Sequence, residues 1–104
     1  MQKDQYIYPC VFIYEDDGIS VYYPDLDGCT TFGIDEQQAF HNAKEALTLH
    51  LYGMEKDNDP IPMPSRIKDI ILDENEQAIL LEVSMPAFSQ LLQSALKQHL
   101  QIKA

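Results

Sequence analysis

The hydrophobic pattern of the chain changes its period at Asp35, and this change limits the folds that are possible. Before Asp35, apolar and aromatic residues form three short runs, at residues 6–14, 19–23 and 29–33. Alternation with period two predicts β-strands, which β-branched and aromatic residues favour. An Asp-Gly pair between the first two runs favours a hairpin. The first third of the chain therefore predicts a three-stranded antiparallel meander. Pro9 cannot donate a ladder hydrogen bond, so its end of the first strand is expected at an edge or a strand start.

A single long helix is predicted after the meander. Its apolar stripe repeats at spacings of three and four residues and consists of Phe40, Ala43, Leu47, Leu51 and Met54. Asp35 suits the N-cap, and Gln38 can close a capping box three residues later. We expect the helix to end near Gly53 or one turn beyond it.

The second half of the chain predicts one more strand and one more helix. Alternating prolines in residues 57–65 indicate a stiff connector, after which Ser65 can cap a short helical turn. Residues 78–84 read as a strand, and Pro86 suits the first turn of a closing helix. The predicted fold class is α+β, in the order β-β-β-α-β-α, with one long helix packed on the sheet. We expect a domain at residues 1–85 and a C-terminal helix at residues 86–104, for oligomerisation or for covering the sheet.

One helix can cover only one face of a sheet, yet the first and fourth predicted strands are apolar on both faces. The other face must be covered by the last helix or by a second copy of the protein. We favour a homo-oligomer, and among oligomers a dimer. The alternative is a monomer whose last helix folds back over the sheet.

The charge balance restricts the partners of the protein. The chain carries 17 acidic and 7 basic residues among its 104, a formal net charge of -10. This balance opposes direct binding to phosphate backbones, which depends on Lys and Arg. It favours a basic protein partner, or it serves solubility alone.

The cysteines and the apolar runs indicate a cytoplasmic location. Cys10 and Cys29 form no Cys-x-x-Cys motif, so they predict no zinc site and read as small apolar residues in a reducing compartment. The sequence shows no signal peptide, and no window reaches the ~18 apolar residues of a membrane span. We therefore expect no membrane association.

Several short motifs follow one another in a fixed order between residues 6 and 65. They are Tyr8-Pro9, Gly18, the run YPDLDGC from Tyr23 to Cys29, Gly33, the run NAKEAL from Asn42 to Leu47, and the proline-rich run from Pro60 to Ser65. In this order and spacing the chain resembles the N-terminal domain of the HicB-type antitoxin family. The resemblance implies a partial ribonuclease-H-like fold without ribonuclease activity. It also implies a small, basic, RNA-cleaving toxin, HicA-like, as the partner.

Many members of this family also carry a C-terminal ribbon-helix-helix or helix-turn-helix domain that binds DNA. About 20 residues follow the fourth predicted strand here, and they supply a strand and one helix at most. Direct DNA binding is therefore not predicted.

The turn between the second and third strands is the predicted partner-binding site. It consists of Tyr23, Pro24, Asp25, Leu26, Asp27 and Gly28. Pro24 fixes one backbone angle and Gly28 permits a positive one, so the turn can be rigid, while Asp25 suits a local Asx-type hydrogen bond. Leu26 has two interpretations. It plugs the end of the core, or it stands out as an apolar anchor ringed by acids.

No catalytic, metal-binding or cofactor-binding residue is predicted, and no enzyme activity. The candidate magnesium ligands are Glu15, Asp16, Asp17, Asp25 and Asp27. Enzymes of the ribonuclease-H-like fold place an essential acid within the first strand, and residues 10–14 contain none. His41 and His50 are nine residues apart, so they point to opposite sides of a helix and cannot share a metal.

The leading hypothesis is an interaction protein that binds and neutralises the toxin of a type II toxin–antitoxin pair. The alternative is an orphan module that binds RNA or another protein without a cognate toxin. A steep salt dependence of RNA binding would favour the alternative.

Overall fold

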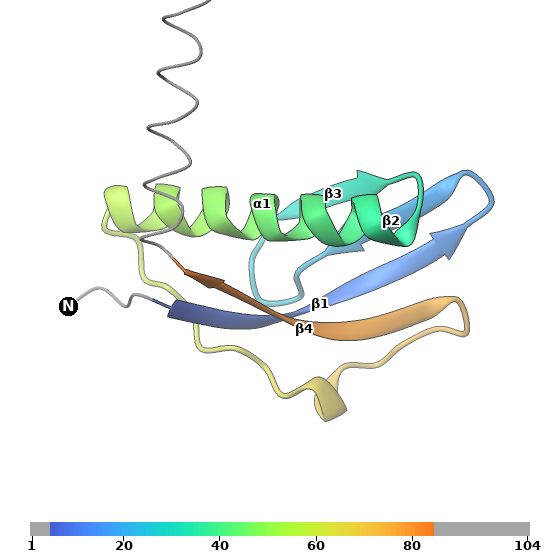
Figure 1. The fold of residues 1–104 in the computed structure, drawn as a ribbon. Coiled ribbons are helices and arrows are strands. Elements are labelled where there is room, and N and C mark those ends of the chain that lie inside the picture. Colours follow the sequence, from blue (N-terminus) through green and yellow to red (C-terminus); the bar gives the residue numbers. More distant parts are fainter. Residues whose placement is uncertain (1–4, 85–104) are drawn as a thin grey trace, which may run out of the picture.

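Strand β1 (Gln5–Glu15) runs through the middle of the sheet in the computed structural model, which describes residues 5–84 (Figure 1). It pairs antiparallel with β2 (Gly18–Tyr22) on one side and with β4 (Glu76–Ser84) on the other, and β3 (Thr30–Gly33) pairs with the outer side of β2. The predicted α+β class, with a meander, a fourth strand and a long helix, is confirmed. The predicted last helix lies outside the described residues.

The two neighbours of β1 differ in length. Strand β2 pairs with residues 11–15 of β1, whereas β4 pairs with residues 5–13. Among the described residues, the first half of β1 therefore has a strand on one side only. Pro9 lies in this half, which confirms that its end of the strand is an edge.

Helix α1 (Glu36–Lys56) begins where the change of period predicts. The side chain of Asp35 accepts a hydrogen bond from the Gln38 N–H at 2.8 Å, which confirms the N-cap. The Gln38 side chain in turn accepts from the N–H of Ile34 at 2.9 Å, one residue before the position that a capping box uses. The helix ends one turn beyond Gly53, within the expected range.

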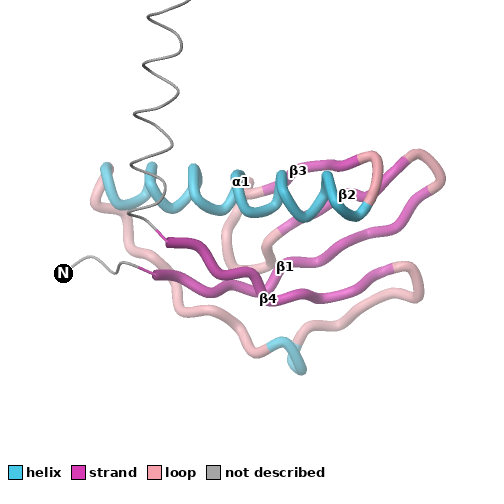
Figure 2. Tube along the Cα trace, viewed as in Figure 1, coloured by secondary structure: helices cyan, strands magenta, loops and turns pink. Residues whose placement is uncertain are grey.

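The helix lies across one face of the sheet, as Figures 1 and 2 show, and its buried side differs slightly from the predicted stripe. The buried residues are Ala39, Ala43, Leu47 and Leu51, with Met54 packed against the core at its margin. Phe40 was predicted in the stripe and is exposed instead. The cause is the close approach of the helix to Gly33, where a Cβ atom would lie 2.3 Å from the backbone nitrogen of Ala39. Position 33 therefore admits only glycine, and the small Ala39 is the helix residue that faces it.

The core lies between α1 and the sheet. The sheet residues that contribute to it are Tyr6, Tyr8, Cys10, Phe12, Ile19, Val21, Leu81 and Val83. Cys10 and Cys29 are free thiols and both are buried, as their interpretation as small apolar residues predicted.

The opposite face of the sheet is only partly covered. Pro9 and Val11 are buried there, whereas Ile7 and Leu80 are about half exposed. The connector between α1 and β4 runs below β1 and β4 in Figure 1, and its short helix η1 (Ile67–Asp69) contacts β4. Cover of the remaining surface by a last helix or a second copy stays a prediction.

Candidate protein interface

The turn from Tyr23 to Gly28 is folded inward around Leu26. The Leu26 side chain is 3% exposed and belongs to the core. Its N–H donates to the Tyr23 carbonyl and its carbonyl accepts from the Cys29 N–H, each at 3.1 Å. Gly28 has φ +79°, the positive angle that the turn was expected to need. Of the two interpretations of Leu26, the core plug is therefore the right one.

Tyr23 fastens the same turn to the helix. It is buried, and its hydroxyl donates to the Ala43 carbonyl at 2.6 Å. Burial raises the pKa of this hydroxyl above its usual range, and the nearby thiols add to the rise. Tyr23 and Leu26 are thus structural residues of the turn, with little surface to offer a partner.

Asp25 joins the turn to the connector. Its carboxylate accepts a hydrogen bond from the Ser65 N–H at 2.9 Å and another from the Ser65 hydroxyl at 2.5 Å. These two residues are 40 positions apart, so the bond is tertiary and not the local Asx bond that the sequence suggested. Ser65 was predicted to cap the short helical turn. Arg66 takes the cap position instead, without a side-chain hydrogen bond, and the Ser65 side chain bonds to Asp25.

The outer surface of the turn remains available. Pro24, Asp27 and Gly28 are exposed, and Asp25 is partly exposed. Of the six predicted site residues, four therefore reach the surface. Their contact with a partner stays a prediction.

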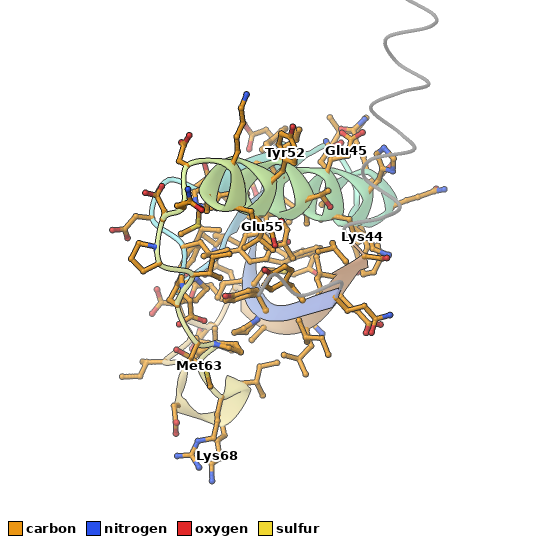
Figure 3. The ribbon with its side chains drawn as sticks, turned by 90° about the vertical axis from the view of Figure 1, so that its left-hand side faces the viewer. Lys44, Glu45, Tyr52, Glu55, Met63 and Lys68 are labelled. Atoms are coloured by element: carbon orange, nitrogen blue, oxygen red, sulfur yellow. The ribbon has the colours of Figure 1, made fainter. Side chains whose placement is uncertain are left out.

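A groove beside this turn was not predicted. It lies between residues 5–8 of β1, the C-terminal end of α1 and residues 58–64 of the connector, and its volume is about 570 Å³. Figure 3 views this end of the molecule, with Glu55 on the side of α1 that faces the sheet and Met63 below it on the connector. The groove exists because β2 is too short to accompany the first half of β1. The edge position of Pro9 is the sequence signal that could have indicated it.

Tyrosine side chains hold the walls of the groove together. The Tyr6 hydroxyl donates to Glu55 Oε2 at 2.5 Å, and the Tyr8 hydroxyl donates to the Pro62 carbonyl. The two rings are stacked with centroids 6.5 Å apart. Burial and the negative charge of Asp25 both raise the pKa of Tyr8. The Tyr8 hydroxyl therefore stays protonated at neutral pH and keeps donating.

The groove is negative with an apolar rim. Glu55 and Asp59 line it, and no lysine, arginine or histidine is among its described lining residues. Met63, 82% exposed, and the half-exposed Ile7 also line it. Such a surface suits a cationic side chain that is flanked by apolar groups.

The acidic residues do not converge on a cation site in the part of the chain that the structure describes. Among residues 5–84, no three His, Cys, Asp or Glu side chains are placed to hold a metal ion. His41 lies beside Glu45 on α1, with 3.5 Å between Nε2 and Oε2. Within the same residues, neither α1 nor η1 is both long enough and apolar enough to cross a bilayer.

Comparison with known proteins identifies a family and a curated relative. The family model for the HicB-like antitoxin of bacterial toxin–antitoxin systems matches residues 8–100. An uncharacterized 14.9 kDa protein from the rep-hol intergenic region of Haemophilus phage HP1 is 35% identical over 65 residues. That match covers 62% of this chain and 49% of the phage protein, so the chain spans about half the length of its curated relative.

Solved antitoxin structures share the fold. A toxin–antitoxin complex from Streptococcus pneumoniae matches with TM-score 0.73 and 19% identity, over 81% of this chain and 72% of that one. A HicA3 and HicB3 toxin–antitoxin complex matches with TM-score 0.58 and 30% identity, over 76% and 96%. The N-terminal domain of the Burkholderia pseudomallei antitoxin HicB matches with TM-score 0.57 and 20% identity, over 76% and 96%. The first and third likenesses show the fold alone.

Proposed function

Because the chain belongs to the HicB-like antitoxin family of bacterial toxin–antitoxin systems, we propose that it binds and neutralises a small, basic, RNA-cleaving toxin of the HicA type. The likeness to a HicA3 and HicB3 complex at 30% identity supports a toxin as the partner. In this role the chain itself catalyses no reaction and works in the cytoplasm. Its contribution is to cover the surface that the toxin uses on RNA.

The observation that carries this proposal is the negative groove with its apolar rim. A basic toxin presents Lys and Arg side chains, and Glu55 and Asp59 offer them carboxylates beside the exposed thioether of Met63. The formal net charge of -10 increases the rate of encounter with such a partner. Apolar contacts at the rim then slow dissociation, which sets most of the affinity. We include the exposed turn residues Pro24 and Asp27 in the proposed contact surface, because Asp25 beside them bonds to Ser65 of the connector.

The test is binding of the purified chain to the small basic protein encoded by the adjacent reading frame, at physiological salt. We expect co-elution as one complex. Asp59→Lys should weaken binding about tenfold or more by placing a positive charge in the groove. Asp16→Lys is the matched control, because Asp16 is an exposed acid in the hairpin between β1 and β2, and it should change affinity much less.

Two outcomes would contradict the proposal. One is that the two proteins elute separately at physiological salt. The other is that RNA binds the free chain with a steep dependence on salt, which indicates phosphate contacts instead. Equal losses for Asp59→Lys and Asp16→Lys would move the interface away from the groove.

A further inference from the structure

Strand β4 presents a long edge that no other strand covers. It is the last strand in the order β3-β2-β1-β4 and has nine residues, whereas β3 at the other edge has four. Apart from the turn bond from the Glu76 N–H to the Asp73 carbonyl, no backbone bond outside the strand ladders joins β4 to another described segment, although η1 touches it. Its sequence contains no proline and no lysine, the residues that usually protect such an edge.

We propose that two copies of the chain pair through β4, antiparallel, about a two-fold axis at Leu80. The product is one continuous sheet with four strands from each copy, and with both α1 helices on the same face. This inference goes beyond the proposed function, because it concerns the association of the chain with itself and is centred on β4, none of whose residues line the groove.

The register follows from the positions of the two glutamates in β4. When Leu80 lies opposite Leu80 of the second copy, Ala78 lies opposite Glu82, and Glu76 lies opposite Ser84. The whole strand is then paired, and no two carboxylates are directly opposite. Like charges directly opposite each other destabilise a strand pair, so this arrangement avoids that cost.

The neighbouring registers are worse. Moving the axis to Ile79 places Glu76 opposite Glu82 of the second copy. Moving it to Leu81 leaves Glu76 and Gln77 beyond the end of the partner strand. The sequence of β4 thus selects the axis at Leu80.

Both faces of the sheet gain from this pairing. On the helix-covered face, the partly buried Ile79 meets Leu81 of the second copy and closes the open flank of the core. On the other face, two Leu80 side chains, each 56% exposed, come together with Cβ atoms about 5 Å apart. Ile7 of β1 pairs with Glu82 of its own chain, so it lies on the same face as Leu80 and extends the apolar surface.

A charge swap at Leu80 tests the pairing on the full chain. Leu80→Glu and Leu80→Lys should each be monomeric in sedimentation or light-scattering measurements, because each places like charges opposite each other. Their mixture should recover a dimer, since the opposed charges then attract. Ile71→Glu, at an almost fully exposed position on the connector, is the control and should leave the dimer of the unchanged chain intact.

Crosslinking tests the register. Leu80→Cys should give a covalent dimer under mild oxidation, since the opposed Cβ atoms lie near the spacing of a disulfide. Ile71→Cys should not, and Cys10 and Cys29 are buried and do not compete. A monomeric parent chain, dimers that persist in both charge variants, or an uncrosslinked Leu80→Cys variant would each overturn the proposal. None of these outcomes depends on whether a toxin binds.

Discussion

Leu80 and Leu81 are neighbours in β4, and they show how differently the two faces of the sheet are used. Leu81 is 1% exposed beneath α1, whereas Leu80 is 56% exposed on the opposite face. The residue type and the strand are the same, so the difference comes from how fully each face is covered at this point. The covered face stabilises the fold, while the other face and the strand edge remain available for association.

Truncating each of the two leucines tests this difference between the faces most directly. We expect Leu81→Ala to lower the free energy of unfolding by about 2–5 kcal/mol, through lost burial and the cavity that remains. Leu80→Ala should change it by about 0.5 kcal/mol or less in the monomer. Denaturant unfolding at low protein concentration measures both. Similar losses for the two variants would mean that the far face is covered as fully as the near one.

Alkaline pH should destabilise the covered face in particular, because both thiols lie in its core. Burial raises the pKa of Cys10 to about 12 and that of Cys29 to about 11, from 9.0. A raised pKa in the folded state means that folding favours the protonated thiol. The stability that the buried thiols contribute is therefore complete below pH 9 and is lost as the pH rises toward 11–12.

The measurement for this prediction is denaturant unfolding in steps from pH 8 to pH 11. We expect stability to fall across the upper half of that range. The fall should be shallower in the Cys10→Ala, Cys29→Ala double variant, although its starting stability is lower. Tyr23 keeps part of the effect in that variant, since burial raises its pKa as well. Constant stability up to pH 11 would show that the thiols ionise without opening the core.

Local sequence patterns predicted the elements that depend on local chemistry. Asp35 at the helix start and the positive φ at Gly28 both follow from the residues within a few positions of them. Phe40 was placed wrongly because the contact between the helix and Gly33 is made by residues of different elements. Helical spacing alone cannot distinguish Ala39 from Phe40 as the inward residue.

The candidate interface could be predicted only in part, because part of it is built from residues of different elements. The turn at residues 23–28 is visible as a motif, and its exposed residues were included. The groove beside it depends on the unequal lengths of β1 and β2 and on the path of the connector. Neither property is encoded in one short stretch of sequence.

The smallest expected effect concerns the bond that holds the connector against the turn. Asp25→Ala and Ser65→Ala should each destabilise the protein by about 1 kcal/mol, because each removes hydrogen bonds to a carboxylate that is partly exposed. In a double-mutant cycle the two losses should fall short of additive, since both variants remove the same contact. Purely additive losses would show that Asp25 and Ser65 act independently. The Asp25→Ala variant should also weaken partner binding more than it weakens the fold, because the connector forms one wall of the groove while the core of the covered face is untouched.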